Sequence, residues 1–293
     1  MKILITGSEG FVGKNLVKGL SQKHTIYTSD QLDSSKHENY SKCDITNYDS
    51  VDKVVRDVDA VIHLTAHSLV SSLDGSITNG RINIIGLLNL LECCKKNSVS
   101  KIIFTSASSL IGEPKSSRVD ENHPPKPKTA YGITKLTSEH YLRLYNELYN
   151  LDYTVFRFFN IYGPFQKNGL IPSIFNKIQN NEPITVFGKG DQIRDYVYIE
   201  DIIPFFEQVT STDISKNQIL NMGTGNGTSI LEIIKSMSEI LNIEPKIEYQ
   251  PSRPGEIGNF VSDTTLLQNT FGNTPSTNVK IGLQKTIDWL TNN

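Results

Sequence analysis

The stretch KILITGSEGFVG, residues 2–13, decides the fold. Its opening run KILIT is short and apolar and predicts a buried strand, and a helical pattern follows from about residue 11. The glycines between and within them allow a tight turn, a close approach of the backbone to a diphosphate, and close packing of helix on strand. Because a helix amino terminus attracts negative charge, the stretch predicts a dinucleotide-binding turn. The residues expected to bind the dinucleotide here are Gly7, Gly10, Phe11, Val12 and Gly13.

A second strand pattern, HTIYTSD at 24–30, ends in Asp30, about 20 residues beyond the glycines. A carboxylate at this point accepts hydrogen bonds from the adenosine ribose hydroxyls and repels a 2′-phosphate. Neither Gln31 nor Leu32 supplies an arginine that would bind such a phosphate. The sequence therefore predicts NAD, rather than NADP, as the cofactor.

Strand and helix patterns continue to alternate through the first half of the chain. Further strand patterns lie at 59–66, 101–106 and 153–159, and helical patterns lie near 50–56, 82–96 and 130–149. This rhythm predicts an α/β protein with a Rossmann-type doubly wound parallel sheet of about six strands.

The composition of the sequence changes after residue 160, where proline, glycine and short elements become more frequent. We therefore expect an NAD-binding domain over 1–159 and a smaller C-terminal substrate-binding domain over 160–293. Some segments of the second range are expected to return to the first domain.

Bulk composition narrows the class of partner. The chain has 293 residues, and its 29 basic and 31 acidic side chains give a net charge of −2, so no overall positive field would attract nucleic acid or anionic lipid. No apolar run approaches the roughly 18 residues of a membrane span, and we expect a soluble, cytoplasmic protein with a small-molecule substrate. Cys43, Cys93 and Cys94 lack CxxC spacing, which favours reduced core thiols over a metal site.

The candidate for chemistry is YGITK, which carries Tyr131 and Lys135 at the start of a predicted helix. A spacing of four places both side chains on one helix face. A lysine cation beside a phenol favours the phenolate, so Tyr131 is expected to act as a base near neutral pH. Of the 12 tyrosines, only Tyr131 has a lysine at this spacing.

These segments together resemble extended short-chain dehydrogenases/reductases that act on nucleotide sugars, most closely the UDP-glucose 4-epimerase-like members. The segments that follow the order seen in that family are GSEGFVG, DAVIHLTA, FTSASSLIGEP, YGITK, RFFNIYGP, GLIP, ITVFGKGDQIRDYVYIEDI and RPGE. They span nearly the whole chain. The same landmarks recur in epimerases, 4,6-dehydratases, decarboxylases and 4-ketoreductases of the superfamily.

The resemblance implies roles for individual residues around NAD. Tyr131 would be the catalytic base, and Lys135 would hold the nicotinamide ribose. Further residues would flank adenine, line the cofactor, support it from a helix, or pack near the nicotinamide: Asp44 and Ile45, then Leu64, Thr65 and Ala66, then Asn83, and finally Phe158.

The resemblance also implies a clamp for a nucleotide sugar. Asn160, Arg194 and Arg253 match positions that bind its phosphates, and two arginines can offset the diphosphate charge with forked donors. Residues expected to border the nucleotide base are Leu170, Val186 and Phe187. Phe260 matches a gatekeeper position at which a large side chain accompanies a preference for the plain hexose over its 2-acetamido form.

The stretch FTSASSLIGEP, residues 104–114, departs from the family pattern. Ala107 stands where the family has its catalytic serine or threonine, and Ile111 replaces a tyrosine. We expect Ser108 to supply the missing hydroxyl at the substrate. Ser106 also flanks the gap and is a second candidate substrate contact, although its hydroxyl is expected to bond to the backbone beneath the cofactor.

The leading hypothesis is NAD-dependent epimerisation of a nucleotide sugar at C4 through a 4-keto intermediate, with UDP-glucose and UDP-galactose as substrates. Dehydratases carry an Asp-Glu pair, and decarboxylases a Glu, where this chain has Ser108 and Ser109, so elimination and decarboxylation are disfavoured. The alternatives are a 4-ketoreductase that consumes NAD(P)H and, because of Ala107, a non-catalytic NAD-binding regulator. The helices near 82–95 and 130–149 resemble those that pair in family homodimers.

Overall fold

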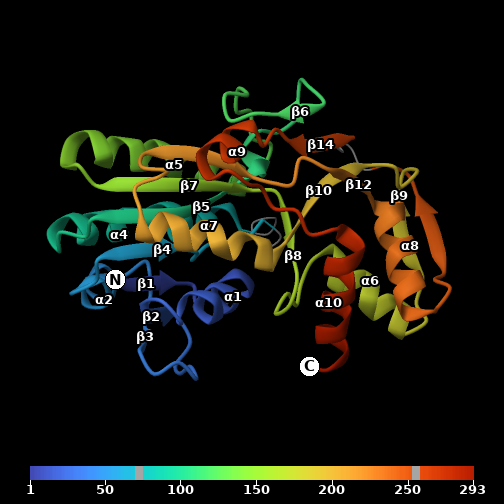
Figure 1. Ribbon diagram of the computed structural model, residues 1–293, viewed down its shortest axis with the longest axis horizontal. Helices are drawn as coiled ribbons and strands as arrows, with labels where there is room; N and C mark the ends of the chain where they lie inside the picture. Colours follow the sequence, from blue (N-terminus) through green and yellow to red (C-terminus); the bar gives the residue numbers. More distant parts are fainter. Residues whose placement is uncertain (70–74, 253–257) are drawn as a thin grey trace. The chain divides into compact units, whose positions relative to one another are not determined.

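The computed structural model describes residues 1–69, 75–252 and 258–293, which form two compact units (Figure 1). The first unit consists of Met1–Gly112, Glu121–Phe158 and Ile203–Asn221. The second unit consists of Glu113–Asp120, Phe159–Ile202 and Met222–Asn293. The chain therefore passes between the units several times, and 203–221 belongs with the first unit although it follows a long stretch of the second.

A seven-stranded sheet, ordered β11-β7-β5-β4-β1-β2-β3, forms the centre of the first unit. Its strands are β1 (Lys2–Thr6), β2 (Thr25–Asp30), β3 (Tyr40–Lys42), β4 (Ala60–His63), β5 (Lys101–Ala107), β7 (Asp152–Phe158) and β11 (Gln218–Met222). Parallel pairing runs from β3 through β2, β1, β4 and β5 to β7. The expected doubly wound parallel sheet is confirmed. Its order reverses at β1, so the carboxyl ends of β1 and β4 border the crevice where such folds bind ligands.

Helices cover both faces of this sheet. Leu4 and Val61 face one side, where they join a buried apolar cluster with residues of α2, α4 and α5. Phe156 faces the other side, where its ring centroid lies 5.1 Å from that of Phe206 in α7. The helices are α1 (Phe11–Leu20), α2 (Tyr48–Val55), α3 (Ser76–Gly80), α4 (Gly86–Lys96), α5 (Ala130–Tyr149) and α7 (Ile199–Ser211), of which α7 begins in the second unit.

Three features of this unit differ from the sequence-based expectation. The strands β3 and β11 were not predicted. The helix expected over 82–96 opens with a π-helical turn, η2 (Arg81–Ile85), so its first residues are wound more widely than in an α-helix. After β5 the chain forms a short 3₁₀ turn, η3 (Ser108–Leu110), before it enters the second unit.

The described residues of the second unit form smaller sheets with helices beside them. One sheet has the order β12-β10-β14-β6, with β8 paired to β10, and the other pairs β13 with β9. The strands are β6 (Arg118–Val119), β8 (Asn160–Tyr162), β9 (Ile184–Phe187), β10 (Ile193–Tyr198), β12 (Gly227–Ser229), β13 (Ile247–Gln250) and β14 (Asn259–Ser262). The helices are α6 (Leu170–Gln179), α8 (Ile230–Leu241), α9 (Thr265–Phe271) and α10 (Val279–Thr291).

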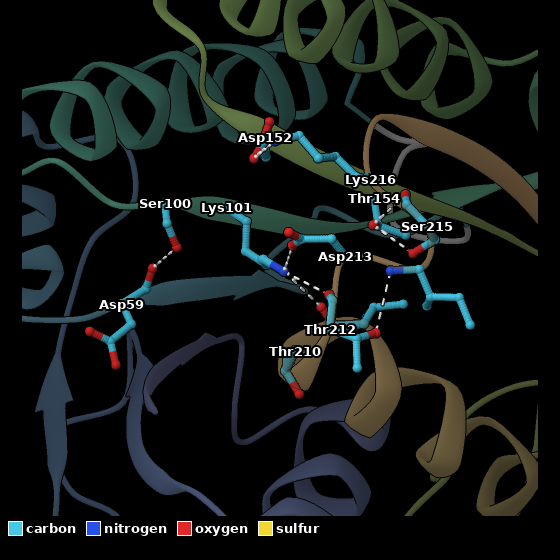
Figure 2. Close-up of polar contacts among 12 residues, drawn as sticks. Asp59, Ser100, Lys101, Asp152, Thr154, Thr210, Thr212, Asp213, Ser215 and Lys216 are labelled. Atoms are coloured by element: carbon cyan, nitrogen blue, oxygen red, sulfur yellow. Dashed lines mark hydrogen bonds and ion pairs between the residues drawn. The ribbon is translucent and has the colours of Figure 1, made fainter.

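A polar cluster at the start of β5 fastens the returning segment 203–221 to the first unit's sheet (Figure 2). The Lys101 ammonium donates to the Thr212 carbonyl at 2.8 Å and pairs with the Asp213 carboxylate at 2.9 Å. Because the last carbonyls of a helix carry partial negative charge, this lysine stabilises the end of α7. Thr154 of β7 adds a 2.9 Å hydrogen bond to the Ser215 carbonyl.

Two findings concern what the composition led us to expect of the cysteines and of membrane-spanning segments. Cys43, Cys93 and Cys94 are buried and form no disulfide, as their apolar setting predicted. Within the described ranges, no helix combines the length and the apolar character that crossing a membrane requires.

Candidate functional site

The glycine turn after β1 leaves no space for side chains. Gly7 adopts a φ of +73°, and a Cβ atom added to it would lie 2.8 Å from the Thr65 nitrogen. A Cβ atom on Gly13 would lie 2.3 Å from the Gly7 carbonyl oxygen. Glycine at these two positions therefore lets the turn lie directly against the end of β4 and lets α1 pack directly on the turn.

The amino terminus of α1 has the properties of an anion-binding site. Gly10 is the N-cap residue, no side chain caps this end, and the first turn holds no acidic residue. Phe11, Val12 and Gly13 form that first turn, so their N–H groups lack the side-chain partner that a capped helix provides. These N–H groups, together with the helix dipole, favour a bound phosphate.

A cavity of about 600 Å³ lies beside this turn, wholly within the first unit. Asp30 lies at its rim, where one carboxylate oxygen accepts a hydrogen bond from the Glu9 N–H at 3.1 Å and the other accepts one from the Gln31 N–H at 2.8 Å. The backbone thus fixes the carboxylate at the carboxyl end of β2. The sequence-predicted cofactor residues that line the cavity are Gly7, Gly10, Asp30, Asp44, Ile45, Leu64, Thr65 and Ala66.

Sequence reasoning missed several cavity residues. Further lining residues lie at or just after the end of β2, in the loop after β4, and on the helical stretch that includes η2. They are Ser29, Gln31, His67, Ser68, Thr78, Arg81 and Ile82. The signal that could have found them is position, because they follow directly from strands already assigned or precede Asn83 on its helix. Their residue types carry no motif of their own.

Asn83 contributes to the cavity through the backbone of a neighbouring loop. Its side-chain oxygen accepts the His67 N–H at 2.7 Å, and its amide donates to the Thr134 hydroxyl at 3.0 Å. Asn79 donates to the His67 carbonyl at 3.0 Å. These buried bonds hold the loop after β4 to the helix that carries Tyr131, so Asn83 shapes the cavity wall without lining it.

Tyr131 and Lys135 lie on the buried side of α5, as their spacing predicted. The helix starts at its N-cap Thr129, whose hydroxyl accepts the Gly132 N–H at 3.0 Å. The Lys135 ammonium lies 5.5 Å from the centre of the Tyr131 ring and donates to the Thr105 carbonyl of β5 at 2.7 Å. The pair therefore stands at the carboxyl edge of the sheet, beside the end of β5.

The electrostatics of this pair differ from the expectation. Burial raises the pKa of Tyr131 to about 12, so in this arrangement Lys135 does not make the phenol a stronger acid. Burial also lowers the pKa of Lys135 to about 7, against the opposing charge of Glu139. Desolvation is the largest cause of both shifts, and the lysine donates to a carbonyl instead of the phenol.

The end of β5 and the turn after it carry the serine hydroxyls that could replace the one missing at Ala107. Ser106 is buried, and its Oγ donates to the Glu139 carboxylate at 2.6 Å, which corrects the expected bond to backbone. Ala107 ends the strand opposite Phe158 of β7. Ser108 begins η3, and its hydroxyl has no hydrogen-bond partner in the described part of the chain. Ser109 also has a buried hydroxyl without a partner there, so Ser108 and Ser109 carry the two unbonded serine hydroxyls at this edge.

Within the second unit, two of the phosphate-clamp candidates lie on neighbouring paired strands, Arg194 on β10 and Asn160 on β8. Arg194 of β10 is in register with Phe260 of β14, and Asn160 of β8 is in register with Tyr196 of β10. Arg194 donates to the Gly258 carbonyl at 2.9 Å. The expected partner arginine, Arg253, lies outside the described residues.

The other second-unit candidates differ in exposure. Leu170 is exposed at the start of α6, Phe187 is half-buried on β9, and Val186 beside it is buried. Phe260 is 6% exposed, and its ring stacks on Phe159 with centroids 5.3 Å apart. Tyr196, which sequence reasoning missed, has a buried hydroxyl without a partner in the described structure. Its place two residues after Arg194 on the same strand was the available signal.

Comparison with known proteins identifies the group to which these features belong. Residues 3–223 match the family model described as the NAD dependent epimerase/dehydratase family. A protein of Methanocaldococcus jannaschii assigned as a UDP-glucose 4-epimerase is 32% identical, over 99% of this chain and 99% of that protein.

Solved structures agree with this match. A UDP-glucose 4-epimerase from Thermotoga maritima with UDP-glucose superposes with a TM-score of 0.92 at 30% identity, covering 100% of this chain and 99% of that one. A UDP-glucuronic acid 4-epimerase from Bacillus cereus in complex with UDP-glucuronic acid and NAD gives a TM-score of 0.92 at 28% identity, covering 100% and 99%.

Proposed function

Because the chain belongs to the NAD-dependent epimerase/dehydratase family, we propose that it interconverts UDP-glucose and UDP-galactose at C4. The resemblance read from the sequence is confirmed, and with it the cofactor NAD and the broad class of UDP-sugar 4-epimerase-like enzyme. The observation that carries the finer proposal is the placement of Tyr131 and Lys135 beside the end of β5, where serines, and no acids, follow Ala107.

The residues of the first unit fit NAD. The uncapped amino terminus of α1 would hold the pyrophosphate, the carboxylate of Asp30 would accept the ribose hydroxyls, and Asp44 with Ile45 would flank adenine. When bound, NAD supplies a hydride acceptor and donor at its nicotinamide ring. We therefore assign 1–159 as the main part of the NAD-binding domain and 160–293 as mainly the nucleotide-sugar domain.

Tyr131 is assigned as the group that takes the proton of the sugar O4 hydroxyl while C4 is oxidised to a ketone. Burial raises its pKa, so the side chain stays a protonated phenol that cannot take up a proton until a cation lies near its oxygen. Lys135 is the cation within reach, and a shift from the Thr105 carbonyl toward the phenol would lower the cost of the phenolate. After the 4-keto sugar turns over in the site, the same phenol returns its proton to O4.

The second unit supplies the proposed clamp for the UDP portion. Arg194, Arg253 and Asn160 are assigned to the diphosphate, for which guanidinium groups offer forked donors. Phe260 is assigned as the limit on the size of the C2 substituent, because a large side chain there leaves less room for an acetamido group. The proposed preference is therefore for the plain hexose.

We also propose that two copies of the chain pair through α5 and the start of α4. Ile133, Leu144 and Leu148 recur at spacings of eleven and four along α5, which places them on one face, and all three are exposed. Ile85 at the end of η2 is exposed as well. Exposed apolar side chains in a row on a helix favour an interface, and a second copy offers the matching row. The unpaired thiols fit a reducing compartment, and we assign the protein to the cytoplasm.

The proposal is tested by incubating the purified protein, with no cofactor added, with a panel of UDP-glucose, UDP-glucuronic acid, UDP-N-acetylglucosamine and TDP-glucose. The expected result is C4 epimer formation, fastest with UDP-glucose. Tyr131→Phe should slow turnover by about two to four orders of magnitude while NAD still binds. Product formation only with added NADH or NADPH and a 4-keto sugar would identify a ketoreductase instead, and no turnover of any sugar would favour the regulator.

A further inference from the structure

Glu139 is a buried acid beside the proposed catalytic pair, and the mechanism above does not use it. It lies on α5 four residues after Lys135 and eight after Tyr131, so the three side chains share one face of the helix. Only 2% of Glu139 is exposed. A buried carboxylate is costly unless it is paired and hydrogen-bonded, so its partners indicate what it does.

Arg157 of β7 and Ser106 of β5 saturate the Glu139 carboxylate. Arg157 Nε donates to one carboxylate oxygen at 3.0 Å and Nη2 donates to the other at 2.8 Å. The Ser106 hydroxyl donates to the first of these oxygens at 2.6 Å. A third donor of Arg157, Nη1, is held by the Glu121 carbonyl at 2.9 Å. The carboxylate is therefore held in one place by a forked ion pair and a hydroxyl, all within the first unit.

This arrangement ties α5 to β5 at two consecutive strand residues. The carbonyl of Thr105 accepts the Lys135 ammonium, and the hydroxyl of Ser106 donates to Glu139. The two helix residues are one turn apart, so the contacts fix the helix against the strand both along its axis and about it. The tie lies directly before Ala107 and Ser108, where β5 leads into the proposed substrate site.

Glu139 also balances charge at Lys135. The titratable groups that face the lysine are Tyr131 and Glu139 from α5 and His63 from β4. Burial, helped by the charge of Lys135, lowers the pKa of His63 to about 3, so this ring is neutral. Within the described residues, Glu139 is thus the one negative group that acts on Lys135, and its charge opposes the effect of burial on that ammonium.

We propose that Glu139 is a positioning residue for Lys135: held by Arg157 and Ser106, it seats the lysine at the end of β5 and keeps it a cation. The inference rests on the proposed function for the roles of Tyr131 and Lys135. Because Glu139 is one helical turn from Lys135 and two from Tyr131, its charge acts mainly on the lysine. Without it, Lys135 loses its proton at a lower pH, and the phenol has no cation beside it over more of the pH range.

The test is a titration of the Lys135 ammonium in NAD-saturated protein labelled with ¹³C at the lysine Cε atoms, followed by the chemical shift of that carbon. The signal that is missing from the Lys135→Arg counterpart is assigned to Lys135. Glu139→Gln keeps the shape of the side chain and an acceptor for Ser106 but removes the charge, and it should lower the midpoint of Lys135 by about one pH unit. Ser106→Ala is the matched control, since it removes a neutral partner of the same carboxylate, and it should leave the midpoint in place.

An unmoved midpoint in folded Glu139→Gln protein overturns the inference, as does an equal shift in Ser106→Ala. If circular dichroism shows that Glu139→Gln does not fold, the double variant with Arg157→Gln replaces the ion pair by an amide pair and should still lower the midpoint. The readout needs no sugar. Wild-type protein that epimerises no UDP-sugar but shows the shift contradicts the proposed function alone, whereas normal epimerisation with an unmoved midpoint contradicts only the role of Glu139.

Discussion

Position 107 carries a methyl group where the resemblance places a catalytic hydroxyl, and the surrounding side chains show which neighbour can replace it. Ser106 points to Glu139 on the helix side, so its hydroxyl is committed to a buried partner. Ser108 lies one residue beyond Ala107, and its hydroxyl has no partner in the described structure. Ser109 has a buried hydroxyl that is also unbonded there, but it lies one residue further from Ala107, so we expect Ser108 to supply the substrate hydroxyl.

Single-turnover formation of NADH in the presence of UDP-glucose distinguishes the serines. Ser108→Ala should slow this step much more than Ser106→Ala, because of these two only Ser108 is free to bridge sugar O4 and Tyr131. Ala107→Ser restores a hydroxyl at the edge of the strand, where little volume is displaced, and should raise turnover. If Ser108→Ala behaves as wild type and Ala107→Ser gains nothing, the proton passes through Tyr131 alone or through water.

We expect Asp30 to set the choice between NAD and NADP. Calorimetry should show NAD binding at least about tenfold more tightly than NADP, since the carboxylate accepts ribose hydroxyls and repels a phosphate. Asp30→Ala should narrow this ratio. Asp33→Ala is a suitable control, because it removes an exposed carboxylate three residues away that pairs with Lys42 and does not line the cavity. Equal affinities of the wild type for the two cofactors would contradict the assignment.

The residues of the site were predictable to the extent that local spacing fixes them. The three glycines, Asp30 and the Tyr131–Lys135 pair follow from short-range patterns tied to one strand or one helix. Glu139 and Arg157 were not predicted, because their pairing joins a helix to a strand through tertiary packing that no local pattern records. The raised pKa of Tyr131 was missed for the same reason, since burial depends on the assembled fold.

At the scale of elements, the strands with continuous apolar runs were predicted and the weakly patterned ones were not. The strand β3, with the sequence YSK, is three residues long and mostly exposed, so it has neither an apolar run nor alternation. The strand β11 is buried, but it joins the sheet beside β7 from more than 50 residues further along the chain. The π-helical turn at 81–85 leaves no mark on the apolar pattern.

The cluster around Lys101 predicts a measurable contribution to stability. Lys101→Met keeps the apolar stem but removes the cation from the end of α7 and from Asp213, so unfolding in urea should show a loss of about 1–2 kcal/mol. Lys216→Met, which removes a more exposed lysine from its pair with Asp152, should cost clearly less. Equal losses in the two variants would show that the helix-end contacts of Lys101 contribute nothing specific.

The whole molecule is expected to work as a pair of chains. Leu148 is 59% exposed near the end of α5, on the face shared with Ile133 and Leu144. Leu148→Glu places a charge in the proposed interface, so analytical ultracentrifugation should show a dimer for the wild type and a monomer for the variant. Leu32→Glu, which changes an exposed leucine elsewhere in the first unit, should remain dimeric. A monomeric wild type would contradict the proposed pairing.

The order of functional segments along the chain was predictable, and so was the return of part of the second range to the first domain. The identity of that part, 203–221, required the structure, because long-range contacts such as those of Lys101 hold it there.

The main proposal for the whole molecule is a closed redox cycle at one carbon of a UDP-hexose. It is tested most directly by incubating the purified protein, with no cofactor added, with UDP-glucose that carries deuterium at C4. The account predicts UDP-galactose that retains the deuterium at C4, because the hydrogen removed from this carbon returns to it without exchange with water. Epimer that has lost the deuterium to solvent, or no epimer at all, would contradict it.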